Sequence, residues 1–416
     1  MIRSDREAVE RAMARRGGDA VAALASLCEL DERARALRGE VEGVRAERTR
    51  ISKDVGRLRR EGADTSVDER RARELGERLA RDEDRLRDLE GERDTLLLTL
   101  PNIAQDDVPV GGEDDAVELR QVGERPALSD PRDHVELATA AGALDLEAAA
   151  RVSGARFAYL KGPLVRLQLA LVGLALDTLE QAGFTPVIPP VLVREEAMWG
   201  TGFFPTDRSS IYRTAEDDLY LVGTSEVPLA GLHGGSILAE EDLPLRYGGL
   251  STCFRREAGA AGKDTRGIFR VHQFDKVEMF SFVLPEHSDE EHLRILAVQE
   301  IILQAIEVPY RVVDIAIGDL GAPAARKFDC EAWMPAQGRY REVTSCSNCT
   351  DYQARRLRAR VRRDKRTEML HTLNGTAVAV GRSLIAILEN HQRPDGTVEI
   401  PAALRAQGAP AVIAPR

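Results

Sequence analysis

Apolar residues repeat in a heptad pattern over the first quarter of the chain. From Leu27 to Leu58 the steps between apolar positions alternate between three and four residues, and Arg48 occupies the one position where an apolar residue is missing. A second run of the same kind extends from Leu75 to Leu100 and is interrupted by two charged residues. This spacing predicts two long helices, each with an apolar seam along one side.

The polar segment EGADTS at 61–66 separates the two runs, and Pro101 ends the second. Two long helices joined by a short turn must pair antiparallel, so that each buries the seam of the other. At about 1.5 Å per residue, a helix of this length reaches on the order of 50 Å. We therefore predict a two-helix coiled-coil arm over about 27–100, within an N-terminal domain at 1–105.

The pattern changes after the arm. The stretch 106–135 is rich in Pro, Gly and Asp and has no helical period, which predicts a linker. Helices then alternate with short strands bounded by Gly and Pro. Strands are expected at 183–193, 219–227, 246–255, 276–283, 310–318, 327–335 and 341–348, and helices at 160–182, 288–306 and 376–390. Because strands follow one another without a helix after each, 136–416 is predicted to be an α+β domain with a mainly antiparallel sheet.

The net charge and the lengths of the apolar runs limit the classes of protein to which this chain can belong. The net charge of −11 excludes a globally basic nucleic-acid binder, although it leaves room for local cationic patches. No apolar run approaches the length of about 20 residues that a membrane span needs, and the N-terminus lacks the apolar centre of a secretory signal. A soluble cytoplasmic protein that does not contact a membrane is expected.

Five cysteines do not suggest a disulfide framework in a chain of 416 residues. Cys346 and Cys349 have the C-x-x-C spacing of a zinc or redox site. The pair has no second pair at zinc-finger distance, which favours ordinary thiols over a metal site.

The stretch 254–280 concentrates cations around a Gly-rich middle, with Lys263 and Arg266 in the loop. Its two ends alternate as strands do, and the second end would place one row of polar and aromatic side chains on a single face: Arg270, His272, Phe274, Lys276 and Glu278. Such a row suits a flat heteroaromatic ring stacked beside phosphates, while a surface hairpin with ion pairs is the alternative. P-loop and Rossmann motifs are absent from the sequence.

Three further features are cationic. Arg382 lies between Gly381 and Ser383 near a predicted helix start, where it either points into a cleft or is simply exposed. The outer half of the first arm helix carries Arg45, Arg48, Lys53 and Arg57, which form either a solvated face or a phosphate-tracking surface. The run RRLRARVRRDKR at 355–366 allows the same two interpretations, with the solvated one favoured.

These segments together resemble a known family. GFTPVIPPVLV (183–193), FRREAGAAGKDTRGIFRVHQFDKVE (254–278) and NGTAVAVGRSLIAILEN (374–390) resemble motifs 1, 2 and 3 of class II aminoacyl-tRNA synthetases. TSE at 224–226, EVTSCSN at 342–348 and the N-terminal arm resemble serine-specific parts. Essentially end to end, the chain resembles a seryl-tRNA synthetase of the bacterial type, and the class I signatures HIGH and KMSKS are absent, as this assignment requires.

The resemblance implies roles for particular residues. Arg255 matches the arginine that holds the ATP α-phosphate and the serine carboxylate, and Phe274 matches the ring that stacks on adenine. The implied ATP site is Arg255, Arg256, Glu257, Arg270, Val271, Phe274, Glu342, Val343, Thr344, Ser345 and Arg382. The implied serine site is Thr224, Ser225, Glu226, Arg255, Glu278, Asn374 and Thr376. Arg255, Glu278 and Arg382 would be catalytic, and Glu342 and Ser345 would hold Mg²⁺ with ATP.

The resemblance also implies partners. The arm would bind tRNA(Ser), and also tRNA(Sec) as a second substrate, through Arg45, Arg48, Lys53 and Arg57. A homodimer built around motif 1 is expected. Cys349, where the family often has Thr, is expected to touch none of these site residues. Three alternatives are a duplicate enzyme that resists an antibiotic, a ligase that passes an amino acid to a carrier protein, and a non-catalytic scaffold.

Overall fold

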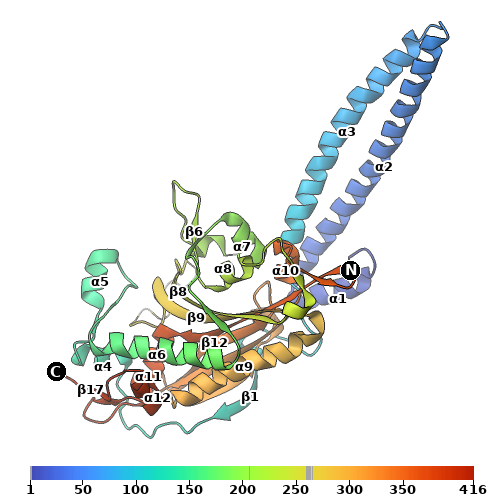
Figure 1. Cartoon of the computed structure of the whole chain (residues 1–416). Coiled ribbons are helices and arrows are strands. Elements are labelled where there is room, and N and C mark those ends of the chain that lie inside the picture. The colour runs from blue at the N-terminus through green and yellow to red at the C-terminus, as the bar shows by residue number, and fades with distance from the viewer. Residues whose placement is uncertain (1, 206, 259–263, 265) are drawn as a thin grey trace. The chain divides into compact units, whose positions relative to one another are not determined.

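The computed structural model describes residues 2–205, 207–258, 264 and 266–416 (Figure 1). Contacts divide the chain into two compact units, Met1–Pro101 and Asn102–Arg416. The helices of the described residues do not combine the length and apolar character that crossing a bilayer requires. Lys263 lies outside the described residues.

The first unit consists of α1 (Arg6–Arg16), α2 (Gly18–Arg60) and α3 (Ser66–Thr99). The Asp5 carboxylate accepts the amide of Ala8 and so caps α1, while Gly17, with φ 108°, allows the turn into α2. The predicted seam is present. Buried side chains from both long helices form two clusters along it: Val41, Val44, Leu75 and Leu79, and then Ala34, Leu37 and Leu89. The predicted coiled-coil arm is confirmed.

Ion pairs between the long helices flank the seam. Arg45 contacts Glu83 at 2.6 Å, and Arg71 contacts Glu47 at 3.2 Å. The Arg48 side chain lies against Gly76 of α3, where a glycine leaves room for it. Exposed pairs of this kind contribute about 0–1 kcal/mol each, so the apolar seam rather than the charges holds the hairpin together.

An eight-stranded sheet forms the centre of the second unit. Its order is β1 (Val117–Val122), β10 (Tyr310–Asp314), β11 (Arg326–Met334), β12 (Arg339–Asn348), β15 (His371–Ala379), β9 (Gln273–Val283), β8 (Leu245–Phe254) and β4 (Thr185–Val187). Within the described strands of this sheet, neighbours pair antiparallel except β4 and β8. The predicted α+β class with a mainly antiparallel sheet is confirmed.

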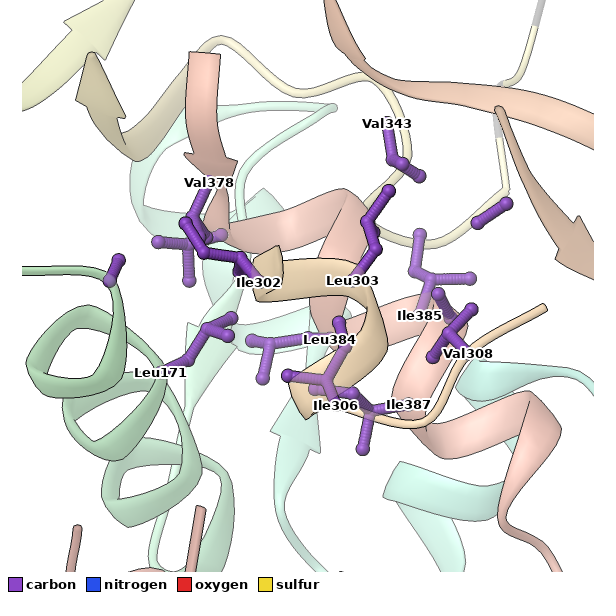
Figure 2. Packing of buried hydrophobic residues seen from close by; sticks show 14 of the residues in the cluster. Leu171, Ile302, Leu303, Ile306, Val308, Val343, Val378, Leu384, Ile385 and Ile387 are labelled. Carbon is purple, nitrogen blue, oxygen red and sulfur yellow. The ribbon is translucent and has the colours of Figure 1, made fainter. Parts of the chain in front are cut away.

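Three helices cover one face of the sheet: α6 (Pro163–Gln181), α9 (Ser288–Ala305) and α11 (Val380–Asn390). Pro163 starts α6, a position that proline tolerates because the first helical amide has no partner within the helix. Figure 2 shows Leu171, Ile302 and Leu384 meeting from these three helices in the main hydrophobic core. Val277 and Met279 of β9 face the same core.

The other face of the sheet carries shorter elements. Phe280 and Phe282 of β9 point to this side and pack against α8 (Glu226–Gly231) and α10 (Tyr352–Leu357), and α7 (Glu195–Thr201) lies against both helices. A small sheet of β14 (Arg366–Met369), β13 (Arg360–Arg363) and β7 (Ile237–Ala239) adjoins them. The remaining α-helices are α4 (His134–Ala140), α5 (Leu146–Ser153) and α12 (Ala402–Ala406). The remaining strands form three pairs: β2 (Leu144–Asp145) with β3 (Tyr159–Leu160), β5 (Leu192–Val193) with β6 (Tyr220–Leu221), and β16 (Val398–Glu399) with β17 (Val412–Ile413).

Several sequence-based expectations differ from the structure. The strand expected at 183–193 is divided into β4 and β5, which pair with β8 and β6 respectively. The helix expected at 376–390 begins at Val380, because 371–379 pairs with β9 as strand β15. The strand expected at 219–227 ends at Leu221, and the chain turns into α8 instead. The stretch 106–135, expected to be a linker, contributes β1 to the edge of the sheet. For β15 and β1, pairing with a distant strand overrides the local pattern.

Candidate active site

A cleft of about 560 Å³, which includes space open to solvent, lies beside β9 and the first turn of α11. Its lining residues come from segments far apart in the sequence: Arg255, Glu257, Ile268, Phe269, Arg270, Val271, Phe274, Lys276, Glu342, Val343, Thr376, Ala379, Gly381 and Arg382. The structure thus brings nine of the residues proposed for the ATP and serine sites to one cleft: Arg255, Glu257, Arg270, Val271, Phe274, Glu342, Val343, Thr376 and Arg382.

The β8–β9 hairpin positions Arg255. The two strands pair in unbroken register from Leu245 opposite Phe282 to Phe254 opposite Gln273. The Arg255 amide donates to the His272 carbonyl at 2.9 Å, which closes the hairpin beyond the last strand pair. The Arg255 Nε donates to the Gly223 carbonyl at 3.2 Å, and its guanidinium lies 5.4 Å from the Phe274 ring centroid. Arg255 is therefore held at two points above an aromatic ring.

Strand alternation places the polar row of β9. Phe274 and Lys276 line the cleft, whereas Val277 and Met279 point into the core on the other side. Lys276 forms an ion pair with the buried Glu278 carboxylate. Arg270, which the sequence placed in the same row, lies before the strand begins but lines the same cleft.

The cleft arginines lie beside carboxylates. Arg270 Nη1 is 2.6 Å from Glu257 Oε2, and Arg382 Nη1 is 3.0 Å from Glu342 Oε1. The Glu342 side chain is 48% exposed, and its pKa is lowered first by the charge of Arg382. Arg270 and Arg382 therefore line a solvent-accessible cleft, where an anionic ligand can replace the carboxylates as their partner.

Phe269 is a cleft residue that the sequence reasoning did not single out. The guanidinium carbons of Arg341 and Arg382 lie 3.9 and 4.8 Å from its ring centroid, in the range of cation–π contacts. Arg341 also pairs with Asp264 at 2.7 Å. An aromatic residue inside the cationic stretch was the available signal, but its position relative to Arg382 depends on the tertiary structure.

A cluster of buried polar side chains surrounds Glu226, the first residue of α8, and Thr376 links this cluster to the cleft. Glu226 Oε1 accepts from Gln353 Nε2 at 2.7 Å and from Asn374 Nδ2 at 3.0 Å. Thr376 Oγ1 donates to Glu278 Oε2 at 3.3 Å nearby. Burial, and then the charge of Glu278, raise the pKa of Glu226 to about 7. Two carboxylates close together in a buried site suit a small cationic and hydroxylated ligand.

Comparison with known proteins identifies the family. Residues 209–391 match the tRNA synthetase class II core domain (G, H, P, S and T), and residues 1–104 match the seryl-tRNA synthetase N-terminal domain. The chain is 50% identical over 398 residues to the serine–tRNA ligase of Thermobifida fusca, a match that covers 95% of this chain and 93% of that protein. The chain belongs to the seryl-tRNA synthetase family.

Two solved structures agree with this assignment. The crystal structure of seryl-tRNA synthetase from Pyrococcus horikoshii complexed with ATP has a TM-score of 0.95 and 43% identity, and the match covers 100% of this chain and 98% of that one. The cytoplasmic serine–tRNA ligase from Naegleria fowleri in complex with AMP has a TM-score of 0.89 and 33% identity, covering 99% and 96%. The resemblance to seryl-tRNA synthetases stated from the sequence is confirmed.

Some residues that the seryl-tRNA synthetase resemblance assigns to the site have other surroundings. The Ser225 hydroxyl is hydrogen-bonded to Gly249 and Ser251 of β8, so it anchors α8 to the sheet. Arg256 is exposed, and its guanidinium carbon lies 6.0 Å from the Tyr212 ring centroid. Thr344 is buried, with its Oγ1 in the protein interior. For these three, the implied contacts with serine or ATP stay predictions.

A β-bulge in β12 lies beside Glu342, one of the two residues proposed for metal binding. The register against β11 shifts so that Thr344 pairs with Cys330 and Glu342 with Glu331. Val343 and Cys346, three residues apart, therefore both belong to the core cluster, and Val343 lines the cleft together with Glu342. Ser345 is half-buried and is not among the residues that line the cleft, so its contact with a metal ion stays a prediction.

The cysteines have different neighbours in this seryl-tRNA synthetase fold. All five lie among the described residues as buried free thiols. Cys346 packs in the core, whereas Cys349 Sγ accepts from Asn374 Nδ2 at 3.5 Å. The expectation that Cys349 touches no assigned site residue is therefore wrong, because β15 brings Asn374 beside the end of β12.

Arg266 is also placed. It pairs with Asp133 and with Glu136 of α4 at the surface, and it does not line the cleft. Arg266 Nη2 lies 3.4 Å from Glu136 Oε1. The role of Lys263 falls outside the described residues.

The raised pKa of Glu226 predicts a measurable dependence of stability on pH. Between pH 4.5 and 7 the folded protein keeps a proton on Glu226 that the unfolded chain has lost. Stability from this group is therefore present at low pH and decreases as pH rises through that window. We expect the free energy of unfolding of the wild type, minus that of Glu226→Gln, to fall by about 3 kcal/mol from pH 4.5 to 7.

Urea unfolding at a series of pH values measures this difference. Glu290→Gln, which changes an exposed glutamate of α9, is the matched control and should follow the wild-type curve. Parallel curves for wild type and Glu226→Gln would contradict a raised pKa at Glu226.

Proposed function

We propose that this chain activates L-serine with ATP and transfers it to the 3′ end of tRNA(Ser), and also of tRNA(Sec) where that tRNA exists. One observation carries the proposal. A cleft lined by arginines and by Phe274 lies next to two buried carboxylates, those of Glu226 and Glu278. The family membership shown above supports the same reaction.

In the first half-reaction, Arg255 is proposed to hold the ATP α-phosphate together with the serine carboxylate. Arg270 and Arg382 are proposed to bind the far phosphates, replacing their present contacts with Glu257 and Glu342. Phe274, which already lies beneath the Arg255 guanidinium, would stack on adenine. The P. horikoshii relative, described as complexed with ATP, supports ATP as the nucleotide.

Adenine recognition is proposed for Glu257 and the backbone around Val271, which line the cleft beside Phe274. Val343 lines the cleft as well, and Arg256 and Thr344 complete the proposed ATP site as chain neighbours of lining residues. Released from Arg270, the Glu257 carboxylate could accept from the adenine amino group, which is a donor.

Glu342 and Ser345 would hold Mg²⁺ with ATP. The residues fit this ion, because a half-exposed carboxylate and a hydroxyl are hard oxygen donors, and Mg²⁺ usually takes one or two carboxylates together with substrate phosphates. When bound, the ion supplies positive charge that neutralises the phosphates. Once Arg382 pairs with a phosphate, Glu342 would be free to hold the ion at the edge of the cleft.

The chemistry needs no protein nucleophile. A serine carboxylate oxygen attacks the α-phosphorus, the bond to the bridging oxygen of pyrophosphate breaks, and seryl-adenylate forms. Arg255 and Arg382 stabilise the charge that develops, and the cleft holds the two reactants in line. A hydroxyl of the terminal tRNA ribose then attacks the seryl carbonyl carbon, and AMP leaves.

Serine selection is proposed for the buried polar cluster around Glu226. The carboxylates of Glu226 and Glu278 would accept from the serine ammonium and hydroxyl, with Thr224, Ser225, Asn374 and Thr376 around them. Alanine would leave these groups unpaired, which is costly in a buried site.

The first unit is proposed to bind tRNA, as a domain at 1–105, and the catalytic domain is proposed at 136–416. Arg45, Arg48, Lys53 and Arg57 are exposed along α2 and would contact the phosphate backbone. A homodimer formed through the motif 1 region, and a cytoplasmic location, are proposed from the family resemblance.

Serine-dependent exchange between ATP and pyrophosphate, followed by charging of tRNA(Ser), tests the proposal. We expect exchange with serine but not with alanine, and formation of seryl-tRNA. No exchange with serine would overturn the activation step. Exchange without charging would favour the carrier-protein ligase. Charging that persists in the presence of an adenylate-mimicking antibiotic would identify a resistant duplicate.

Phe274→Ala tests the adenine platform. Loss of a stacking ring costs about 1–3 kcal/mol per base, so the KM for ATP should rise by about 5- to 150-fold while the KM for serine changes little. Steady-state exchange kinetics measure both constants. Phe274→Tyr keeps the ring and should stay near wild type. An equal rise in both KM values would argue for general damage to the hairpin instead.

A further inference from the structure

Gln353 lies in the first turn of α10 and is fully buried, with 0% of its surface exposed. Its Nε2 donates to Glu226 Oε1 at 2.7 Å and to the Thr201 carbonyl at 3.3 Å. Its Oε1 accepts from the Thr372 hydroxyl at 2.9 Å. The side chain therefore joins the ends of α7 and α8 to strand β15 through one amide.

The direction of this amide follows from its partners. The Thr201 carbonyl and an ionised Glu226 carboxylate can only accept hydrogen bonds, so the nitrogen of Gln353 must face them. Thr372 can donate, and it faces the oxygen. A side chain that both donates and accepts is required here, and neither glutamate nor an apolar residue of the same size meets that requirement.

The contact also orients Glu226. Gln353 and Asn374 both donate to Oε1, and they approach it from α10 and β15. In the part of the chain that the structure describes, both side-chain amides therefore donate to the same carboxylate oxygen of Glu226. Neither of these donors uses the second oxygen, Oε2, which can therefore accept a hydrogen bond from a ligand.

We propose that Gln353 is a positioning residue for serine recognition, which fixes the Glu226 carboxylate so that Oε2 faces the ammonium or hydroxyl of bound serine. The inference rests on the proposed function, in which Glu226 contacts serine. Gln353 itself acts through Glu226.

Two physical consequences follow if Gln353 is replaced by a residue without an amide. Glu226 loses one of its two donors and can rotate, so serine binds more weakly. The hydrogen bond from Gln353 also lowers the pKa of Glu226, against the larger effect of burial. Without it, the ionised form of Glu226 should appear at a higher pH.

Gln353→Met removes the amide and keeps a similar volume. Because hydrogen bonds to charged groups contribute about 1.5–3 kcal/mol, the KM for serine in ATP–pyrophosphate exchange should rise by about 10- to 150-fold at pH 7.5. The KM for ATP should change by less than about 3-fold, since Gln353 does not line the nucleotide cleft. The pH at which 1/KM for serine reaches half of its maximum should move upward.

Thr372→Val provides a second variant if Gln353→Met fails to fold. It removes the hydroxyl that orients the amide, so we expect the same selective rise in the KM for serine, but a smaller one. Thr372→Ser keeps the hydroxyl and is the matched control, with a KM for serine close to that of the wild type. Thermal unfolding of each variant records its stability separately.

The outcomes are distinguishable. Equal changes in the KM for serine and for ATP, or an unchanged KM for serine in both Gln353→Met and Thr372→Val, would overturn the positioning role and leave the activity standing. Absence of serine-dependent exchange in the wild type would overturn the proposed function itself.

Discussion

Arg255→Ala should reduce serine-dependent ATP–pyrophosphate exchange by about 10²- to 10³-fold, the usual cost of removing one preorganised donor from a developing negative charge. Arg255 is half-buried, is held by the Gly223 carbonyl and lies over Phe274, so its guanidinium is directed before any substrate arrives. A donor fixed in this way acts on the transition state without reorganising.

The effect should appear mainly in kcat, because the charge that Arg255 stabilises grows as the pentacoordinate phosphorus forms. Arg255→Lys keeps the charge but loses the planar fork, and an intermediate loss is expected. Arg393→Ala, which removes an exposed arginine that pairs with Glu399 and does not line the cleft, is the matched control. Activity of Arg255→Ala within about 3-fold of wild type would contradict the assignment of Arg255 to the α-phosphate.

Deleting residues 35–90 and joining the ends by a short turn should leave exchange within about 2-fold of wild type and reduce charging by about 10²-fold or more. The deletion removes the outer seam, including the Val41, Val44, Leu75 and Leu79 cluster, and keeps the first turns of α2 and the end of α3. The exchange reaction uses only ATP and serine, whereas charging also needs tRNA.

Point substitutions in the arm test the contribution of its positive charges to tRNA binding without removing the helices. Replacing Arg45, Arg48, Lys53 and Arg57 together by Ala should weaken tRNA binding and reduce its dependence on salt concentration, because each phosphate contact releases counterions. Replacing two exposed arginines of the second unit, Arg151 and Arg393, should change neither quantity. Equal loss of exchange and charging after deletion of the arm would contradict a role confined to tRNA.

The arm could be predicted because its stabilising contacts are periodic. A seam repeats every three or four residues on each helix, so the heptad pattern alone predicts which side chains, such as Leu37 and Val41, are buried. The cleft face of β9 was predictable for the same reason. Alternation at 274, 276 and 278 places Phe274 and Lys276 on one side whatever the partners are, and the structure agrees.

The contacts across the site could not be predicted in this way. Gln353 meets Glu226 across 127 residues of sequence, and no local pattern marks either as a partner of the other. The direction of Ser225 toward β8, and the contact of Cys349 with Asn374, likewise depend on which strands become neighbours.

By itself, the sequence determined the two-helix arm and the α+β class, because these follow from the periodicity of apolar residues. It also determined the family, through motifs that resemble those of known synthetases. Only the tertiary structure decided that 371–379 is a strand, that Arg382 and Arg341 share the Phe269 ring, and that Glu226 has a pKa near 7. Strand pairing, burial and hydrogen bonding between distant segments set these properties, and none of them is encoded in the residues adjacent in the chain.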